Sequence, residues 1–155
     1  MTQRIDFEIL FSLKGRTALI SDASSGLDEY FAQVLSGLGA HVVVAARRAD
    51  KLSSLVQALR DQGGMADAIA MDASSRRSVR DAFEAFDAQF LQLDILVNNA
   101  GIANPPLRFV DATEDDWAPV LHVNLIGAWR IGQEAARRIK LQRSGNIVNM
   151  DSIYS

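Results

Sequence analysis

The sequence predicts an α/β protein in which helices cover both faces of a doubly wound parallel sheet, giving three layers (α/β/α). Short β-branched apolar runs alternate along the chain with longer segments whose apolar residues recur every three or four positions. The strand-like runs are continuously apolar, which is typical of parallel strands buried on both faces. Five such runs, each separated from the next by a helical segment, indicate right-handed crossover connections within one sheet.

The first half of the chain contains three strand–helix pairs. The expected strands cover residues 17–20, 41–45 and 68–71. Apolar residues at helical spacing place the helices within residues 27–38, 52–59 and 79–90. Gly39 is positioned to end the first helix, and Gly63 with Gly64 to end the second.

The second half contains two more strands and one long helix between them. Residues 94–97 form the fourth expected strand, and residues 146–150 the fifth. Thr113 followed by Asp116 resembles a capping box, so we expect the helix to run from about 114 to 140, with a break near its start. No helical segment follows the fifth strand to cover it, so the sequence predicts a fold truncated after that strand.

The composition limits the class of protein. A chain of 155 residues with 48% hydrophobic and 23% charged residues predicts one domain over residues 13–155, preceded by an N-terminal extension over residues 1–12. A net charge of −3 argues against nucleic-acid binding, and the lack of cysteine and of partners for His41 and His122 argues against a metal site. Because the chain has no apolar run of about 18 residues and no secretory signal, we expect no membrane association and a cytoplasmic protein.

A pair of side-chain amides follows the fourth strand directly. Asn98 and Asn99 precede Ala100 and Gly101 at the carboxyl end of a strand, where open α/β sheets bind ligands. Amides beside a core must bond either the local backbone or a ligand. A strand-to-loop turn and a ligand site are therefore both consistent with this motif alone.

Three further motifs accompany this pair: Asp72 after the third strand, Asn124 within residues 123–127, and the strand segment 145–152. With these residues the chain, from about Leu13 to its last residue, resembles the classical short-chain dehydrogenase/reductase family. The resemblance implies a Rossmann-like fold and an NAD(P)(H)-dependent oxidoreductase, which reduces a carbonyl or oxidises an alcohol in a small molecule by hydride transfer. It also implies that this chain is the cofactor-binding portion of such an enzyme.

The resemblance assigns cofactor binding to residues that follow the first four strands: Ser21, Ser24, Ser25, Gly26, Leu27, Arg47, Arg48, Asp72, Ala73, Asn99, Ala100 and Gly101. At the end of the second strand, an acidic residue would bind a ribose 2′-hydroxyl, whereas an arginine pairs with a 2′-phosphate. Ala46 stands in the acidic position and Arg47 follows it, so the resemblance implies NADP(H) over NAD(H). The alternative is that Arg47 and Arg48 are solvated loop cations.

Two positions of the first turn depart from the family pattern. Of three glycines only Gly26 remains, because Asp22 and Asp28 occupy the other two positions. At an effective dielectric constant of about 20, a carboxylate about 5 Å from another unit negative charge costs about 3 kcal/mol. We therefore expect these two residues to weaken the binding of a cofactor pyrophosphate.

The catalytic motif of the family is incomplete in this chain. The resemblance gives Asn124 a role in a proton relay, and gives Ser152 the role of orienting the substrate carbonyl. In the family, a tyrosine about a dozen residues after that serine acts as general acid, and a lysine four residues further on lowers the pKa of the tyrosine. Neither residue has a counterpart in this chain. Tyr154 lies too close to Ser152 to replace that tyrosine. We expect the chain to be inactive alone; a catalytically dead nucleotide-binding or interaction module and a degenerate fragment are the alternatives.

The long helix carries more apolar surface than a single buried face requires. Its apolar and small residues at three- and four-residue spacing are Trp117, Val120, Leu121, Leu125, Ala128, Trp129 and Gly132. In the family that the chain resembles, this helix pairs with its copy in a neighbouring subunit. The sequence therefore predicts a homo-oligomer.

Overall fold

Five parallel strands form one sheet in the order β3-β2-β1-β4-β5. They are β1 (Thr17–Ser21), β2 (His41–Ala46), β3 (Met65–Ala70), β4 (Ile95–Asn98) and β5 (Asn146–Asn149). The structure, a computed structural model, describes residues 7–22, 26–103 and 108–151, so that Ser24, Ser25, Ser152 and Tyr154 lie outside the described residues. The predicted doubly wound parallel sheet is confirmed.

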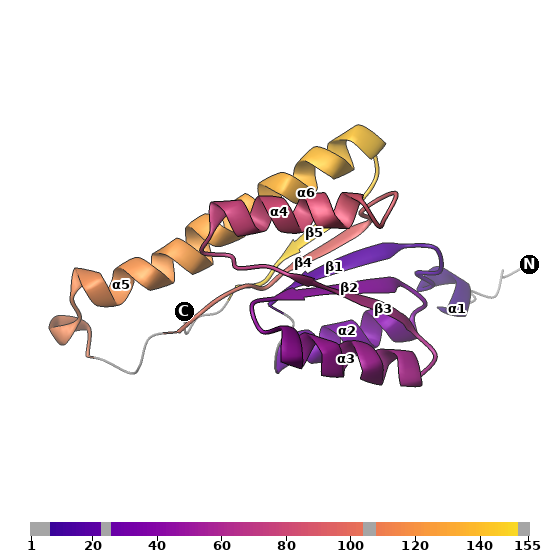
Figure 1. Ribbon diagram of the computed structural model, residues 1–155, viewed down its shortest axis with the longest axis horizontal. Helices are drawn as coiled ribbons and strands as arrows, with labels where there is room; N and C mark the ends of the chain where they lie inside the picture. Colours follow the sequence, from indigo (N-terminus) through magenta and orange to yellow (C-terminus); the bar gives the residue numbers. More distant parts are fainter. Residues whose placement is uncertain (1–6, 23–25, 104–107, 152–155) are drawn as a thin grey trace, which may run out of the picture.

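Helices cover both faces of this sheet (Figure 1). One face carries α2 (Leu27–Gly37) and α3 (Ala49–Asp61), and the other carries α4 (Arg76–Asp87) and α6 (Ala128–Gln142). A short helix, α1 (Phe7–Leu10), precedes β1. Gly39 and Gly63 follow the ends of α2 and α3 as predicted, and both adopt positive φ angles that favour glycine.

Strand β3 begins at Met65, three residues earlier than the sequence pattern predicts. It lies at an edge of the sheet, so only Ala66 and Ile69 of its residues are buried, and the strand does not form one apolar run. Asp67 interrupts the apolar pattern, yet its carboxylate lies 2.6 Å from His41 and 2.7 Å from Arg60. His41 therefore has an acidic partner on the neighbouring strand, which its spacing from carboxylates in the sequence does not reveal.

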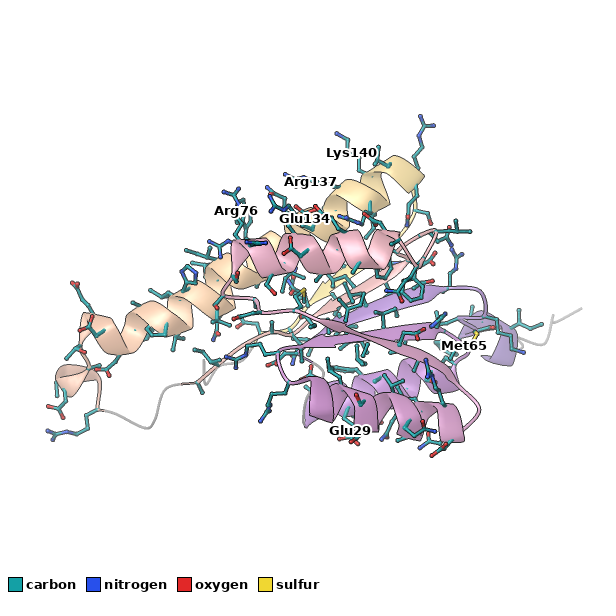
Figure 2. The ribbon with its side chains drawn as sticks, viewed as in Figure 1. Glu29, Met65, Arg76, Glu134, Arg137 and Lys140 are labelled. Carbon is teal, nitrogen blue, oxygen red and sulfur yellow. The ribbon has the colours of Figure 1, made fainter. Side chains whose placement is uncertain are left out.

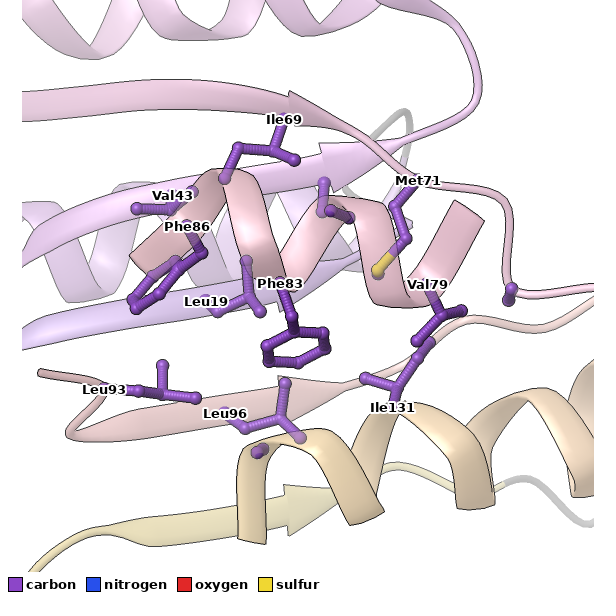
Figure 3. Close-up of a cluster of buried hydrophobic side chains, with 14 residues drawn as sticks. Leu19, Val43, Ile69, Met71, Val79, Phe83, Phe86, Leu93, Leu96 and Ile131 are labelled. Atoms are coloured by element: carbon purple, nitrogen blue, oxygen red, sulfur yellow. The ribbon is translucent and has the colours of Figure 1, made fainter. Parts of the chain in front are cut away.

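Two apolar clusters join the sheet to its helices. The cluster under α4 and α6 contains Leu19, Phe83, Phe86, Leu96 and Ile131, all almost fully buried (Figure 3). The cluster on the opposite face contains Ile20, Val42 and Leu59, which lie against α2 and α3. Burial of each large side chain stabilises the fold by about 1.5–3 kcal/mol, so these clusters hold the carboxyl ends of the strands in fixed positions.

The long helix predicted over residues 114–140 is a rod of three segments: α5 (Glu114–Leu121), a π-helical turn η2 (His122–Gly127) and α6. The rod extends past the end of the sheet (Figure 1). A short 3-10 turn, η1 (Phe109–Asp111), precedes it. The predicted capping box is confirmed, because Thr113 Oγ1 accepts from the backbone N–H of Asp116, and the Asp116 carboxylate accepts from the Thr113 backbone. The Thr113 hydroxyl also donates to the Asp116 carboxylate, at 2.6 Å, and this bond together with the one from the Thr113 backbone N–H holds the pKa of Asp116 below its ordinary value.

The segment before β1 is tied to the sheet by polar contacts. The Leu13 backbone N–H donates to the Leu38 carbonyl at 2.8 Å, and the Arg16 guanidinium lies 2.7 Å from the buried Asp94 carboxylate. Asp94 also accepts from the Thr17 backbone N–H at 2.9 Å, so one carboxylate joins the starts of β1 and β4. Within the described ranges, no helix is long and apolar enough to cross a membrane.

Candidate cofactor site

The candidate site lies where β1 and β4 run side by side and end together. From β1 the chain crosses to one face of the sheet through α2, and β4 belongs to the half that is covered by α4 and α6. Connections that diverge to opposite faces leave a crevice beyond the carboxyl ends of the two strands, which is the ligand-binding position of open α/β sheets. Ser21 and Asp22 end β1 here, and Asn98 and Asn99 end β4.

Ser21 organises the two strand ends from inside the protein. Its hydroxyl oxygen accepts hydrogen bonds from the backbone N–H groups of Asn99 and Ala100 at 2.9 and 3.0 Å. The side chain is fully buried, so it acts from inside the protein. The loop after β4 leaves two N–H groups that need an internal acceptor, and Ser21 supplies it. A role of Ser21 in cofactor binding stays a prediction.

The two amides after β4 have different roles. Asn98 is buried, and its Nδ2 donates to the Ala128 carbonyl and to Asn149 Oδ1, both at 2.9 Å. It therefore joins β4 to α6 and to β5. Asn99 is partly exposed, and its Nδ2 donates to Asp28 Oδ1 at 2.5 Å. The first amide is thus a structural link, whereas the second lies at the surface of the crevice.

Asn124 holds the loop that follows this motif. Its Oδ1 accepts from the Ile102 backbone N–H at 2.8 Å, and its Nδ2 donates to the Ile102 carbonyl at 2.9 Å. A Cβ atom at Gly101 would lie 3.5 Å from Asn124 Oδ1, so the loop passes close to this side chain. Both amide atoms are engaged in this clamp, which lies in the π-helical turn, a geometry frequently found at functional sites. The role of Asn124 in a proton relay stays a prediction.

One pocket brings together residues that the sequence places far apart. It is lined by Asp22, Arg47, Met71, Asp72, Ala73, Ala100, Gly101, Ile102 and Val123. Five of these lining residues are predicted cofactor residues: Arg47, Asp72, Ala73, Ala100 and Gly101. They follow β2, β3 and β4, so the pocket joins the ends of three strands. Asp72 is held in place because its Oδ1 accepts from the backbone N–H and the hydroxyl of Ser74, at 2.9 and 2.7 Å.

Arg47 and Arg48 lie at the end of β2, and both are exposed. Ala46, which precedes them, is almost fully buried. Arg47 lines the pocket together with Asp22 and Asp72, whereas Arg48 does not line it. The two neighbouring arginines are therefore placed differently with respect to the pocket.

The first turn places its two acidic residues at different depths. Asp22 adopts a positive φ of 62°, as a glycine would, and lines the pocket. Asp28 lies in the first turn of α2, where it is only 5% exposed and bonds Asn99. Burial and, to a smaller extent, the negative charge of Asp22 raise the pKa of Asp28 to about 7, against the opposing effect of the Asn99 hydrogen bond. Asp28 and Asn99 lie 71 residues apart, so no local sequence pattern indicates this contact, although Asp28 itself departs from the family pattern.

A second, larger cleft adjoins the pocket along α6 and β5. Leu27, Asn99, Ala100 and Gly101 of the predicted cofactor residues line it, together with Asn124. Its remaining wall is mainly apolar and includes Leu125, Trp129, Ile147 and Met150. Gly26 adopts a φ of 69° just before α2, an angle that favours glycine. Because Leu27 lines the cleft, the cleft reaches the start of α2.

Comparisons with known proteins agree with this arrangement. A sequence model described as short chain dehydrogenase matches residues 16–155. Nodulation protein G of Rhizobium sp. (strain N33) is 37% identical over 144 residues, which cover 93% of this chain and 57% of that protein. The 2-dehydro-3-deoxy-D-gluconate 5-dehydrogenase of Bacillus subtilis (strain 168) is 34% identical over 146 residues, which cover 94% and 56%.

Solved structures give the same result. A gluconate 5-dehydrogenase from Burkholderia cenocepacia J2315, in complex with NADP and tartrate, superposes with a TM-score of 0.88 at 33% identity. The match covers 95% of this chain and 57% of that one, so the chain spans a little over half the length of these relatives. Since the family model matches nearly the whole chain and the strand ends carry the corresponding motifs in one crevice, the chain belongs to the short-chain dehydrogenase family.

Proposed function

We propose that this chain forms the NADP(H)-binding part of an oxidoreductase that interconverts a carbonyl and an alcohol in a small molecule. The observation that carries the proposal is the pocket in which Arg47, Asp72, Ala73, Ala100 and Gly101 share one wall. Ala46 leaves the end of β2 without the carboxylate that would select a ribose 2′-hydroxyl. The neighbouring Arg47 offers a guanidinium for a 2′-phosphate.

The adenosine end of the site fits such a cofactor. Asp72 uses one carboxylate oxygen for Ser74, which leaves the other to accept from an adenine amino group. The pyrophosphate would lie at the start of α2, where backbone N–H groups and the helix dipole favour an anion. The chemistry that nicotinamide supplies when bound is hydride transfer. The residues of this chain bind and orient the cofactor, and the apolar wall of the larger cleft excludes water from its reactive end.

Replacing Arg47 by aspartate tests the cofactor preference. We expect Arg47→Asp to weaken NADPH binding at least tenfold and to shift preference toward NADH, because the guanidinium is lost and an acceptor for the 2′-hydroxyl is gained. Calorimetric titration with both cofactors measures the effect. Arg77→Asp is the matched control, since Arg77 is an exposed arginine on α4 outside the pocket. An unchanged ratio of the two affinities would identify Arg47 as a solvated cation.

We further propose that the 155-residue chain binds its cofactor without turning over a substrate. General acid–base catalysis contributes about 10²–10⁴ in rate, and this chain has no tyrosine at the family's spacing from Ser152. A steady-state assay of NADPH oxidation with a panel of ketones should give no measurable rate. Robust turnover that disappears in Tyr154→Phe would contradict the proposal, since it would make Tyr154 the acid.

A further inference from the structure

We propose that Asp28 couples the binding of a cofactor pyrophosphate to the uptake of a proton, so that the chain binds a dinucleotide more tightly at low pH. The inference rests on the proposed function, because it concerns the same site. It assigns a positioning and regulatory role to a residue that replaces a glycine of the family pattern.

The geometry fixes the Asp28 carboxyl beside the expected position of the phosphates. Asp28 is the second residue of α2, the helix whose start faces the crevice. Its Oδ1 accepts from Asn99 Nδ2 at 2.5 Å, and the Asn99 backbone N–H is in turn held by Ser21 at 2.9 Å. With 5% of its surface exposed, the residue is packed between α2 and the loop after β4. The carboxyl is therefore held in place when a ligand arrives.

The surroundings of Asp28 are neutral or negative. Asp22, from the turn after β1, acts on it with the same sign of charge, and Asn99 on the opposite side is neutral. Glu29, next to it on α2, is exposed, and Asp151 lines the same cleft as Leu27 and Asn99. Arg47 shares the pocket with Asp22, but no described cation acts directly on Asp28. An ionised Asp28 thus lacks a compensating positive charge.

A pyrophosphate that approaches this turn adds negative charge beside a carboxyl group that is already poorly solvated. Because the pKa of Asp28 is about 7, the group is protonated in a large fraction of molecules at neutral pH. A proton taken from solvent by Oδ2 leaves Oδ1 free to accept from Asn99, so the contact is kept and the charge is removed. Ligand binding therefore favours the protonated form. Molecules in which Asp28 is ionised take up a solvent proton on binding, so the average uptake near pH 7 is less than one proton per ligand.

Calorimetric titration of NADPH into the native chain and into Asp28→Asn tests the coupling. Between pH 6 and pH 8, we expect the affinity of the native chain for NADPH to fall about ten times more than the affinity of Asp28→Asn does. The asparagine cannot ionise but still offers an oxygen to Asn99. The 2′-phosphate of the ligand also titrates, with a pKa near 6, but this contribution is common to both proteins. Glu29→Gln, which changes an exposed neighbour on α2, should retain the native pH dependence.

Two readouts separate failure of this inference from failure of the proposed function. Titration in buffers of different ionisation enthalpy should show net proton uptake near pH 7 in the native chain, in excess of that in Asp28→Asn. Equal pH dependence in the two proteins, with binding intact, would overturn the inference alone. If Asp28→Gly and the native chain both fail to bind any nicotinamide cofactor, the proposed function is wrong. Without any ligand, an NMR titration in which the Asp28 carboxyl ionises near its ordinary pKa would also overturn the inference.

Discussion

At the scale of single residues, a buried carboxyl group shows how the fold accommodates an unfavourable substitution. Asp28 occupies a position where close packing between helix and loop favours glycine, yet α2 still begins at Leu27. The hydrogen bond to Asn99 satisfies one oxygen of the carboxyl, and the raised pKa of about 7 reduces the cost of burying a charge. The protein therefore tolerates Asp28 by partial neutralisation.

This tolerance predicts a pH dependence of stability. Because the folded-state pKa of Asp28 is about 7 and its ordinary value is 3.8, the folded chain binds more protons between these pH values. Its free energy of unfolding should therefore fall as pH rises through that window and change no further above it. Between pH 5 and pH 8 we expect the native chain to lose about 2 kcal/mol more than Asp28→Asn does, as measured by urea unfolding. Parallel curves for the two proteins would show that Asp28 ionises normally when folded.

At the scale of elements, the π-helical turn η2 connects the long helical rod to two loops of the site. Asn124 clamps the loop after β4 through Ile102. Gly127 faces the loop after β3, where the Ala73 carbonyl oxygen would lie 2.8 Å from an added Cβ. The sequence predicts a helix with a break near its start, but not the π-turn, because a π-turn preserves apolar spacing closely enough to hide the extra residue. Asn124 and Gly127 contact the two loops from this turn.

The close approach at Gly127 leads to a prediction with a matched control in the same rod. Gly127→Ala should lower the free energy of unfolding by about 1–3 kcal/mol, because the new methyl group overlaps the backbone of Ala73. Gly132→Ala, in α6, meets only Asn98 Nδ2 at 3.8 Å and should be neutral or stabilising by up to about 1 kcal/mol through helix propensity. Thermal or urea unfolding compares them. A Gly127→Ala protein as stable as Gly132→Ala would show that η2 does not press on this loop.

At the scale of the whole molecule, the helical rod (α5, η2 and α6) exposes both apolar and charged side chains. Six large apolar side chains on it are exposed: Trp117, Leu121, Leu125, Ile126, Trp129 and Leu141. Arg76 of α4 lies on the same side of the molecule as Glu134, Arg137 and Lys140 of α6, whereas Glu29 lies on the opposite side of the sheet (Figure 2). Strand β5 is also an edge strand with exposed residues, including Val148. Exposed apolar side chains beside an open sheet edge favour association.

We therefore predict dimers or larger assemblies in solution. Light scattering over a range of concentrations should give a mass above that of a monomer of 16.9 kDa. Leu125→Glu should lower the average mass, because it places a charge on the exposed rod. Leu91→Glu is the control, since Leu91 is fully exposed and lies outside the rod. A monodisperse monomer at high concentration would contradict the prediction.

The sequence by itself determined the fold class, because it depends on periodicity, and it indicated candidate site residues through the residue types that follow the strands. Continuous runs such as residues 42–45 indicate buried parallel strands, and Asp72 and Asn99 follow such runs. Tertiary structure decided the start of β3, because an edge strand with Asp67 in it lacks that pattern. It also decided the roles of Ser21 and Asp28, because both depend on Asn99, which lies more than 70 residues away in the sequence and comes into contact only through the pairing of β1 with β4. Local patterns report what a segment can form, whereas the partner of each buried polar group depends on which segments the sheet brings together.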